Sequence, residues 1–295
     1  MNGFLNLLKP PGMSSGTAVA IIKRLTGEKV GHAGTLDPEA SGVLPIMVGR
    51  ATRLLDLFCD KSKSYVAEIA FSGATDTQDA QGVILEKGVR IPEREEFLSV
   101  LPSFTGTIMQ RPPAYSAVKR GGVPLYALAR KGELVVTDAR ETEIRSLELG
   151  ERTGETGYML SVDCGGGTYI RTLCHDIGQA MGAPAHMRFL LRTRAGSFSI
   201  ENAVTVEEAM KAAEEGRLES LLLPLDYPVM GYPVFSVPER YRKMARNGSK
   251  LPASLLPDLA NGEKCRVYDG DVFLGIAHKA DEEIRFDVGF TGGDL

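Results

Sequence analysis

Apolar residues along this chain recur with two different periods, and each period predicts a different kind of element. The spacing of Val19, Ile22 and Leu25 is helical, and Ser14 and Ser15 precede it as candidate N-caps. The same reasoning predicts further helices over 51–58, 93–101, 170–181 and 206–216.

Strands are predicted where apolar and polar side chains alternate, as they do over 65–71 and 158–164. Residues 264–277 form a predicted hairpin whose turn is Asp269-Gly270. Strands and helices follow one another in an irregular order. This order predicts an α+β fold, with a mixed, largely antiparallel sheet flanked by helices.

Two regions interrupt this pattern. Residues 110–133 contain too many prolines and glycines for a core sheet, so we expect an excursion that can move onto a ligand. Tyr-Pro pairs at 227–228 and 232–233 indicate a boundary near residue 230. We therefore expect a large domain over 1–229 and a small one over 230–295.

Charge is distributed unevenly along the 295 residues, whose formal net charge is -4. Residues 101–140 hold six basic and two acidic side chains, whereas 201–230 hold two basic and seven acidic ones. A basic segment on a mildly acidic body fits local docking of nucleic acid, although it also fits an ordinary solvated surface.

The remaining composition narrows the class of protein. The four cysteines are scattered and form no C-x-x-C pair, so we expect reduced thiols and neither a zinc site nor a disulfide framework. No apolar run has membrane-spanning length, and no charged-then-apolar leader opens the chain. The expectation is a cytoplasmic protein that does not bind membranes.

One acidic residue, Asp37, lies in a loop shaped by glycine and proline. Pro38 pushes Asp37 toward an extended conformation, and Gly31 and Gly34 supply a backbone that a second molecule can approach closely. A carboxylate displayed in this way can act as a nucleophile or a base. The alternative is an ordinary Asp-Pro turn, in which the carboxylate caps its own backbone.

The longer string around Asp37 favours the first interpretation. Residues 31–45, continued by 48–53, resemble the catalytic motif of the TruB family of bacterial tRNA pseudouridine synthases. Four further blocks resemble this family in the same order: 3–15, 110–119 with 126–130, 167–171 with 176–178, and 190–198. The departures are Arg53, where lysine is frequent in the family, and Leu191, where arginine is frequent.

The resemblance implies that the protein isomerises uridine at position 55, in the T arm of tRNA, to pseudouridine. It also implies the pseudouridine synthase fold, with a small C-terminal β-barrel of the PUA type. The reaction rearranges one nucleotide, so no cofactor and no metal are expected. The expected partner is the T-arm stem-loop of tRNA, bound by a monomer without an obligatory protein partner.

The resemblance also assigns roles to single residues. Asp37 is the expected nucleophile, Arg171 the guanidinium that keeps it charged, and Tyr65 the ring that stacks on the base and takes part in proton transfer. The residues expected to contact the RNA substrate are His32, Tyr169, Leu190, Lys9, Arg111, Lys119 and Arg130.

Several alternatives stay open at this point. The motif is shared by RNA-guided relatives that work within a multiprotein particle, and the same surface would suit a chaperone that refolds tRNA. A hydrolase pairing Asp37 with Asp76 or Asp79 is a third possibility. Tyr65, Tyr169 and Leu190 would also fit an apolar core. The residues do not distinguish attack of Asp37 on C1′ from addition to C6 or a glycal route.

Overall fold

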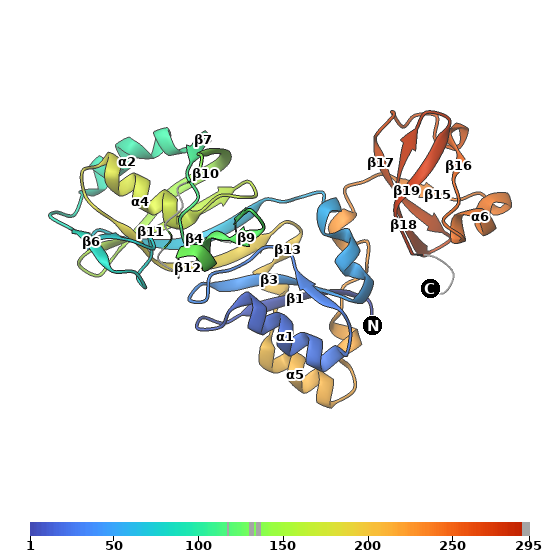
Figure 1. Cartoon of the computed structure of the whole chain (residues 1–295), viewed down its shortest axis with the longest axis horizontal. Helices are drawn as coiled ribbons and strands as arrows, with labels where there is room; N and C mark the ends of the chain where they lie inside the picture. Colours follow the sequence, from blue (N-terminus) through green and yellow to red (C-terminus); the bar gives the residue numbers. More distant parts are fainter. Residues whose placement is uncertain (117, 130–132, 134–136, 291–295) are drawn as a thin grey trace.

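A mixed sheet of ten strands forms the body of the protein in this computed structural model, which describes residues 1–116, 118–129, 133 and 137–290 (Figure 1). Two pairs of its strands are parallel, β1 with β14 and β3 with β12, and the others are antiparallel, which confirms the predicted fold class. In spatial order the strands are β14 (Val204–Thr205), β1 (Gly3–Lys9), β3 (Ser41–Val48), β12 (His186–Ala195), β4 (Lys63–Ala70), β11 (Gly157–Cys164), β10 (Arg140–Thr153) and β7 (Gly106–Gln110), with β2 (Val30–His32) beside β3 and β13 (Phe198–Ser199) beside β12.

Four helices pack on one face of this sheet through a shared apolar cluster. They are α1 (Ser15–Thr26), α2 (Arg94–Val100), α4 (Ile170–Ala180) and α5 (Val206–Glu214). The first begins and ends where its sequence predicts. The Ser14 hydroxyl accepts the Thr17 N–H at 3.0 Å, and Gly27 closes the helix in a left-handed conformation. None of the described helices has the length and apolar character needed to cross a membrane.

The opposite face carries a second apolar cluster around Phe4, Val43 and Phe198. The segment predicted as a helix over 51–58 covers part of it, but as a 3-10 helix, η1 (Gly49–Leu57). Further 3-10 turns lie at Leu101–Phe104, Ile200–Asn202, Leu218–Leu221, Tyr227–Val229, Glu239–Tyr241 and Ala253–Leu255.

A separate sheet with its own apolar core occupies the C-terminal end of the molecule (Figure 1). The predicted hairpin is present, but its turn is one residue later than predicted, at Gly270-Asp271, because Asp269 still pairs with Val272. Arg53 of η1 fastens this sheet to the body, because it donates to the Gly289 carbonyl at 2.8 Å and lies over the Phe290 ring. Its strands, in spatial order, are β15 (Val234–Ser236), β17 (Lys264–Asp269), β18 (Val272–Ala280), β19 (Glu283–Gly289) and β16 (Leu251–Pro252), and the short helix α6 (Arg242–Arg246) adjoins them.

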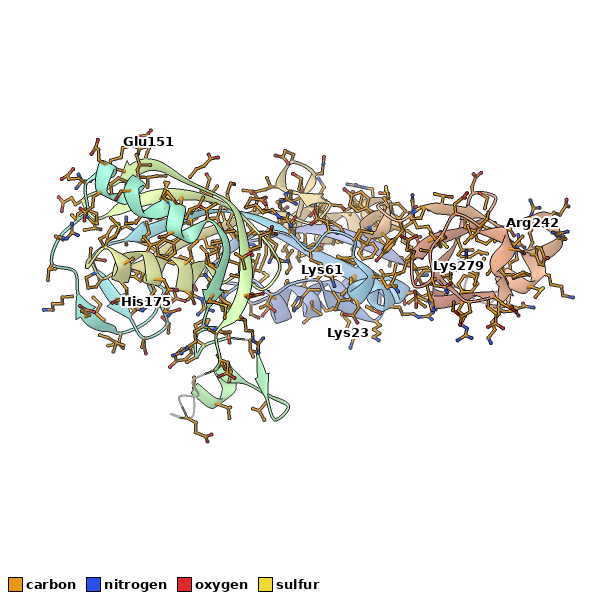
Figure 2. The ribbon with its side chains drawn as sticks, turned by 90° about the horizontal axis from the view of Figure 1, so that it is seen from above. Lys23, Lys61, Glu151, His175, Arg242 and Lys279 are labelled. Carbon is orange, nitrogen blue, oxygen red and sulfur yellow. The ribbon has the colours of Figure 1, made fainter. Side chains whose placement is uncertain are left out.

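The predicted excursion after residue 110 leaves the body as a small unit of its own. It contains the two-stranded pair β8 (Lys119–Arg120) and β9 (Val123–Pro124), followed by α3 (Leu125–Ala129). Figure 2 shows this unit projecting from one side of the body. A second two-stranded pair, β5 (Gly73–Thr75) with β6 (Ile84–Lys87), flanks the loop that crosses residues 76–83.

Gly42 lies where β3 and β12 approach most closely, beside Arg192. Its φ of +114° is unfavourable for other residues, and an added Cβ would lie 2.2 Å from the Arg192 carbonyl oxygen. We therefore expect Gly42→Ala to lower the free energy of unfolding by about 3 kcal/mol or more.

Chemical denaturation would measure this loss. The matched control is Gly12→Ala, at a glycine with φ +77° and no atom within 4 Å of the added Cβ. It imposes a strained backbone without a clash, so equal losses in the two variants would contradict the close approach.

Candidate active site

The loop that carries Asp37 joins β2 to β3, and side chains from distant parts of the chain hold it in place. The buried Ser15 hydroxyl hydrogen-bonds both backbone groups of Leu36, at 2.9 Å each. The ammonium of Lys9 donates to the Pro38 carbonyl at 3.0 Å. Of the two candidate N-caps, Ser14 alone caps the helix, and Ser15 fixes the residue before Asp37.

Arg192 of β12 holds the same loop from the other side. Its guanidinium donates to the carbonyls of Gly34 at 2.9 Å, Thr35 at 3.4 Å and Val43 at 2.7 Å, and its side chain is buried. The backbone on both sides of Asp37 is therefore fixed, which orients the carboxylate before any substrate arrives.

Asp37 and Arg171 form a two-point ion pair. The Arg171 Nε and Nη2 atoms lie 2.9 and 3.1 Å from the two carboxylate oxygens. The same guanidinium donates to the carbonyls of Thr77 and Tyr115, at 3.2 and 2.9 Å. The Arg171 side chain is 6% exposed and that of Asp37 is 35% exposed, so the arginine lies beneath a carboxylate that one side of the site can reach.

The charges around Asp37 act in opposite directions. Burial raises the pKa of its carboxyl group, the Arg171 guanidinium lowers it, and the Asp79 carboxylate raises it again, with a net upward shift. Asp79 lies 3.7 Å from Arg171 and accepts hydrogen bonds from the Thr77 hydroxyl and the Gln81 N–H. One guanidinium thus contacts two carboxylates, and Asp37 is the nearer of the two.

The start of α4 determines where Arg171 points. The buried Gln110 side chain accepts the Tyr169 N–H at 3.0 Å and donates to the Tyr169 carbonyl at 3.3 Å. Tyr169 is thereby held at the N-cap position, so the helix begins at the next residue, Ile170. The sequence pattern places Arg171 off the apolar stripe of this helix, yet the side chain is buried against the catalytic loop.

Tyr65 enters the site from β4, directly opposite Arg192 on β12. The residue is 7% exposed, and burial raises the pKa of its phenol although the Arg192 charge acts in the opposite direction. Leu190 is equally buried, two residues before Arg192 on the same strand. Both side chains fit the core alternative as well as the site, since the site is built on the core.

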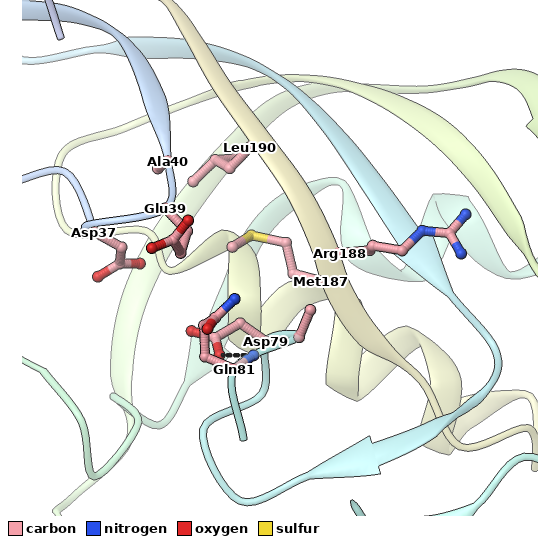
Figure 3. Close-up of a pocket in the computed structure, with 9 residues that line it drawn as sticks. Asp37, Glu39, Ala40, Asp79, Gln81, Met187, Arg188 and Leu190 are labelled. Atoms are coloured by element: carbon pink, nitrogen blue, oxygen red, sulfur yellow. Dashed lines mark hydrogen bonds between the residues drawn. The ribbon is translucent and has the colours of Figure 1, made fainter. Parts of the chain in front are cut away.

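A small cavity of about 30 Å³ opens beside the Asp37 carboxylate (Figure 3). This volume holds only about two or three water molecules, so a nucleobase enters only if side chains move. The Arg188 guanidinium points away from Asp37 in Figure 3. The cavity is lined by Asp37, Glu39, Ala40, Asp79, Ala80, Gln81, Met187, Arg188 and Leu190.

The structure places the other expected substrate contacts at different depths. His32 lies on β2 with its Nδ1 atom buried and unbonded, and burial lowers its pKa, which favours the neutral ring. Arg111 is exposed directly after β7. Lys119 lies on β8 of the projecting unit, and Arg130 lies outside the described residues.

Lys9 differs most from its expected role. The side chain is fully buried, and its ammonium donates to three backbone carbonyls, those of Pro10, Met13 and Pro38. Burial lowers its pKa to about 8. This placement favours a role in holding the Asp37 loop over the expected contact with RNA.

Sequence reasoning did not name three of the side chains that build the site: Ser15 as a loop anchor, Gln110 and Arg192. A signal existed for all three, because they lie within the family-like strips at 3–15, 110–119 and 190–198. Among the described residues, no group of three or more His, Cys, Asp or Glu side chains is arranged to hold a metal ion.

Two family models match consecutive parts of the chain. Residues 23–170 match the TruB family pseudouridylate synthase N-terminal domain, and residues 171–230 match the tRNA pseudouridylate synthase B C-terminal domain. Among curated relatives, tRNA pseudouridine synthase B of Pelotomaculum thermopropionicum is 42% identical over 292 residues, covering 96% of this chain and 92% of the relative. The protein of that name from Alkaliphilus oremlandii is 40% identical over 287 residues, covering 96% and 95%.

Solved structures with the same fold include a Cbf5-Nop10-Gar1 complex and an H/ACA RNP bound to a substrate RNA containing 2′-deoxyuridine. The first has a TM-score of 0.75 at 27% identity, and the second 0.74 at 25%; each match covers 99% of this chain and 86% of the other. The long matches at about 40% identity, and the two family models that abut at the start of α4, lead to one conclusion: the chain belongs to the TruB family of pseudouridylate synthases.

Proposed function

We propose that this protein converts uridine 55, in the T arm of tRNA, to pseudouridine, with Asp37 as the nucleophile. The observation that supports this proposal is the two-point pair of Asp37 with Arg171 beside a partly open cavity. A guanidinium fork favours the ionised form of the carboxyl group and orients it, as a nucleophile requires. The names of the curated relatives support tRNA as the substrate.

The reaction needs few groups. The bond between N1 and the ribose C1′ breaks, the freed base turns, and C5 joins C1′, while C5 loses a proton and N1 gains one. Substrate and product are isomers, so the electrons balance without a redox partner. We assign the role of nucleophile to Asp37 and that of the cation that orients it to Arg171. Ring stacking and proton transfer are assigned to Tyr65, which lies on β4 opposite Arg192.

The target base reaches Asp37 only after it leaves its stack in the RNA loop, at a cost of a few kcal/mol. Contacts between the unit at 110–133 and the RNA backbone would offset this cost. One link between that unit and the site is the bond from Arg171 to the Tyr115 carbonyl. A movement of the projecting unit when RNA docks would thus act on the pair of Asp37 and Arg171.

We further propose that the separate C-terminal sheet is a PUA-like RNA-binding domain spanning 230–295, attached to a catalytic domain spanning 1–229. Its own apolar core and its spatial separation in Figure 1 support this division. The protein is proposed to act as a monomer without an obligatory protein partner, in the cytoplasm with its tRNA. Identities of 42 and 40% with tRNA pseudouridine synthase B, against 27% for the Cbf5 complex, favour this role over the RNA-guided one.

A T-arm stem-loop tests the proposed function directly. The purified protein is incubated with this RNA in the presence of EDTA and without added cofactors, and the modified nucleotide is located. The expected result is a pseudouridine at position 55 with no change in RNA mass. Cleaved RNA would instead identify a hydrolase. A second stem-loop carries cytidine at position 55, and pseudouridine at any other position of this RNA would refute the assigned position.

We expect Lys119→Ala to weaken binding of T-arm RNA and to reduce the slope of affinity against salt by about one phosphate contact. Conversion of RNA that is already bound should stay largely intact, because Lys119 belongs to β8 of the projecting unit. Affinity measured at several salt concentrations checks this. The control is Lys211→Ala on the acidic helix α5; equal slopes in both variants would remove β8 from the docking surface.

A further inference from the structure

A second buried arginine of the site, Arg192, makes no salt bridge with a carboxylate in the part of the chain that the structure describes. Its side chain is only 1% exposed, and its guanidinium contacts three backbone carbonyls. Neutral oxygens compensate a buried charge less well than a carboxylate does, so the placement is costly. A neutral side chain with N–H groups could donate to these carbonyls at a lower cost, so the charge and shape of the guanidinium need a further reason.

The groups around Arg192 supply that reason. Gly34 and Thr35, which accept two of its hydrogen bonds, are in the loop that presents Asp37. On the other side, Tyr65 is its direct cross-strand neighbour, and the guanidinium lowers the pKa of the phenol against the effect of burial. One planar guanidinium-bearing side chain therefore lies against both elements that carry the proposed reacting groups, the β2–β3 loop with Asp37 and β4 with Tyr65.

The backbone supports this arrangement. Gly42 pairs with Arg192 across the parallel β3–β12 contact, and the absence of a side chain there lets the two strands approach. The carbonyl of the next residue, Val43, then accepts the Arg192 Nε–H at 2.7 Å. The guanidinium donates hydrogen bonds from Nε as well as from both terminal nitrogens, so its position varies little.

We infer that Arg192 is a positioning residue for the isomerisation, which fixes the phenol oxygen of Tyr65 relative to the Asp37 carboxylate. The inference rests on the proposed function. The two groups belong to different elements, β4 and the β2–β3 loop, and Arg192 lies against both: it pairs with Tyr65 across the sheet and donates to two carbonyls of the loop. A lysine has a single nitrogen and cannot span them as the planar fork does.

The test is Arg192→Lys, measured as single-turnover conversion of saturating T-arm RNA. The expected rate on bound RNA falls about 50-fold, because a small misplacement of reacting groups is enough for such a loss. RNA affinity should stay within about threefold. Arg194→Lys is the matched control: Arg194 lies two residues further along β12 and binds Asp60 and Asp163, and its rate should change less than about threefold.

A double-mutant cycle with Tyr65→Phe separates positioning from general support of the fold. If Arg192 acts through the Tyr65 oxygen, Arg192→Lys should cost at least about tenfold less in the Tyr65→Phe background than in the wild type. Equal losses in both backgrounds would overturn the inference. So would a large drop in melting temperature for both Arg192→Lys and Arg192→Gln, because that would make the arginine a structural residue.

Different outcomes refute the proposed function and the proposed role of Arg192. A wild-type protein that leaves T-arm RNA unchanged refutes the proposed function itself. A wild-type protein that converts the RNA, together with an additive cycle, refutes only the role of Arg192.

Discussion

Asp37→Asn should bind T-arm RNA with nearly unchanged affinity and convert none of it. Asparagine keeps the shape of the side chain and can still accept a bond from Arg171, but its amide is no nucleophile. Removal of a nucleophile from a preorganised site costs about 10⁵-fold or more in rate. Single-turnover conversion and filter binding on the same RNA would measure the two effects separately.

The control for this variant is Asp76→Asn. The Asp76 carboxylate accepts the Val83 N–H and belongs to the neighbouring loop, so we expect most of the activity to remain. Appreciable turnover by Asp37→Asn would contradict the assignment of the nucleophile. The same variant also tests the chaperone alternative: if it refolds tRNA as well as the wild type does, folding is independent of modification.

Arg171→Met should lower the rate at pH 7 by about 10³-fold, since it removes both the charge that ionises Asp37 and the fork that aims it. Burial and Asp79 both raise the pKa of Asp37, and Arg171 is the main opposing group. Without it the pKa rises further, so a larger fraction of the carboxyl groups is protonated at neutral pH. The nucleophile is the ionised form, so the lost activity should partly return as pH increases.

The pH profile of single-turnover rates checks this sign. The wild type should lose activity on the acidic side as Asp37 is protonated, and the Arg171→Met variant should show the same loss at a higher pH. Arg188→Met is the control, because Arg188 lines the same cavity but pairs with Glu68. Identical acidic limbs in wild type and Arg171→Met would show that the pair does not control ionisation.

Local signals in the sequence predicted α1, α2, α4 and α5, the C-terminal hairpin, and two of the ten strands of the large sheet, β4 and β11. The helix at α1 was predicted with its cap and its stop, because both depend on neighbouring residues. The long strand β10 was not predicted, since its alternation is interrupted by a register shift between Ile144 and Ser146. The segment at η1 has a helical pattern, and the period alone does not distinguish a 3-10 helix from an α-helix.

The site was harder to predict because its key contacts are not local. Asp37 and Arg171 are 134 residues apart, and no periodicity joins them; the family resemblance alone paired them. Lys9 illustrates a different point. This lysine ends the apolar strand β1, and that local position indicates a buried side chain, whereas the predicted contact with RNA came from the resemblance.

The narrow cavity beside Asp37 has a consequence for what this protein leaves alone. Widening it requires free energy, and only a ligand that gains that energy elsewhere can supply it. Free uridine or a short single strand has no such distant contacts, whereas a structured stem-loop gripped along its backbone does. Discrimination against the cell's many other uridines then depends on the narrow resting cavity, before any base is read.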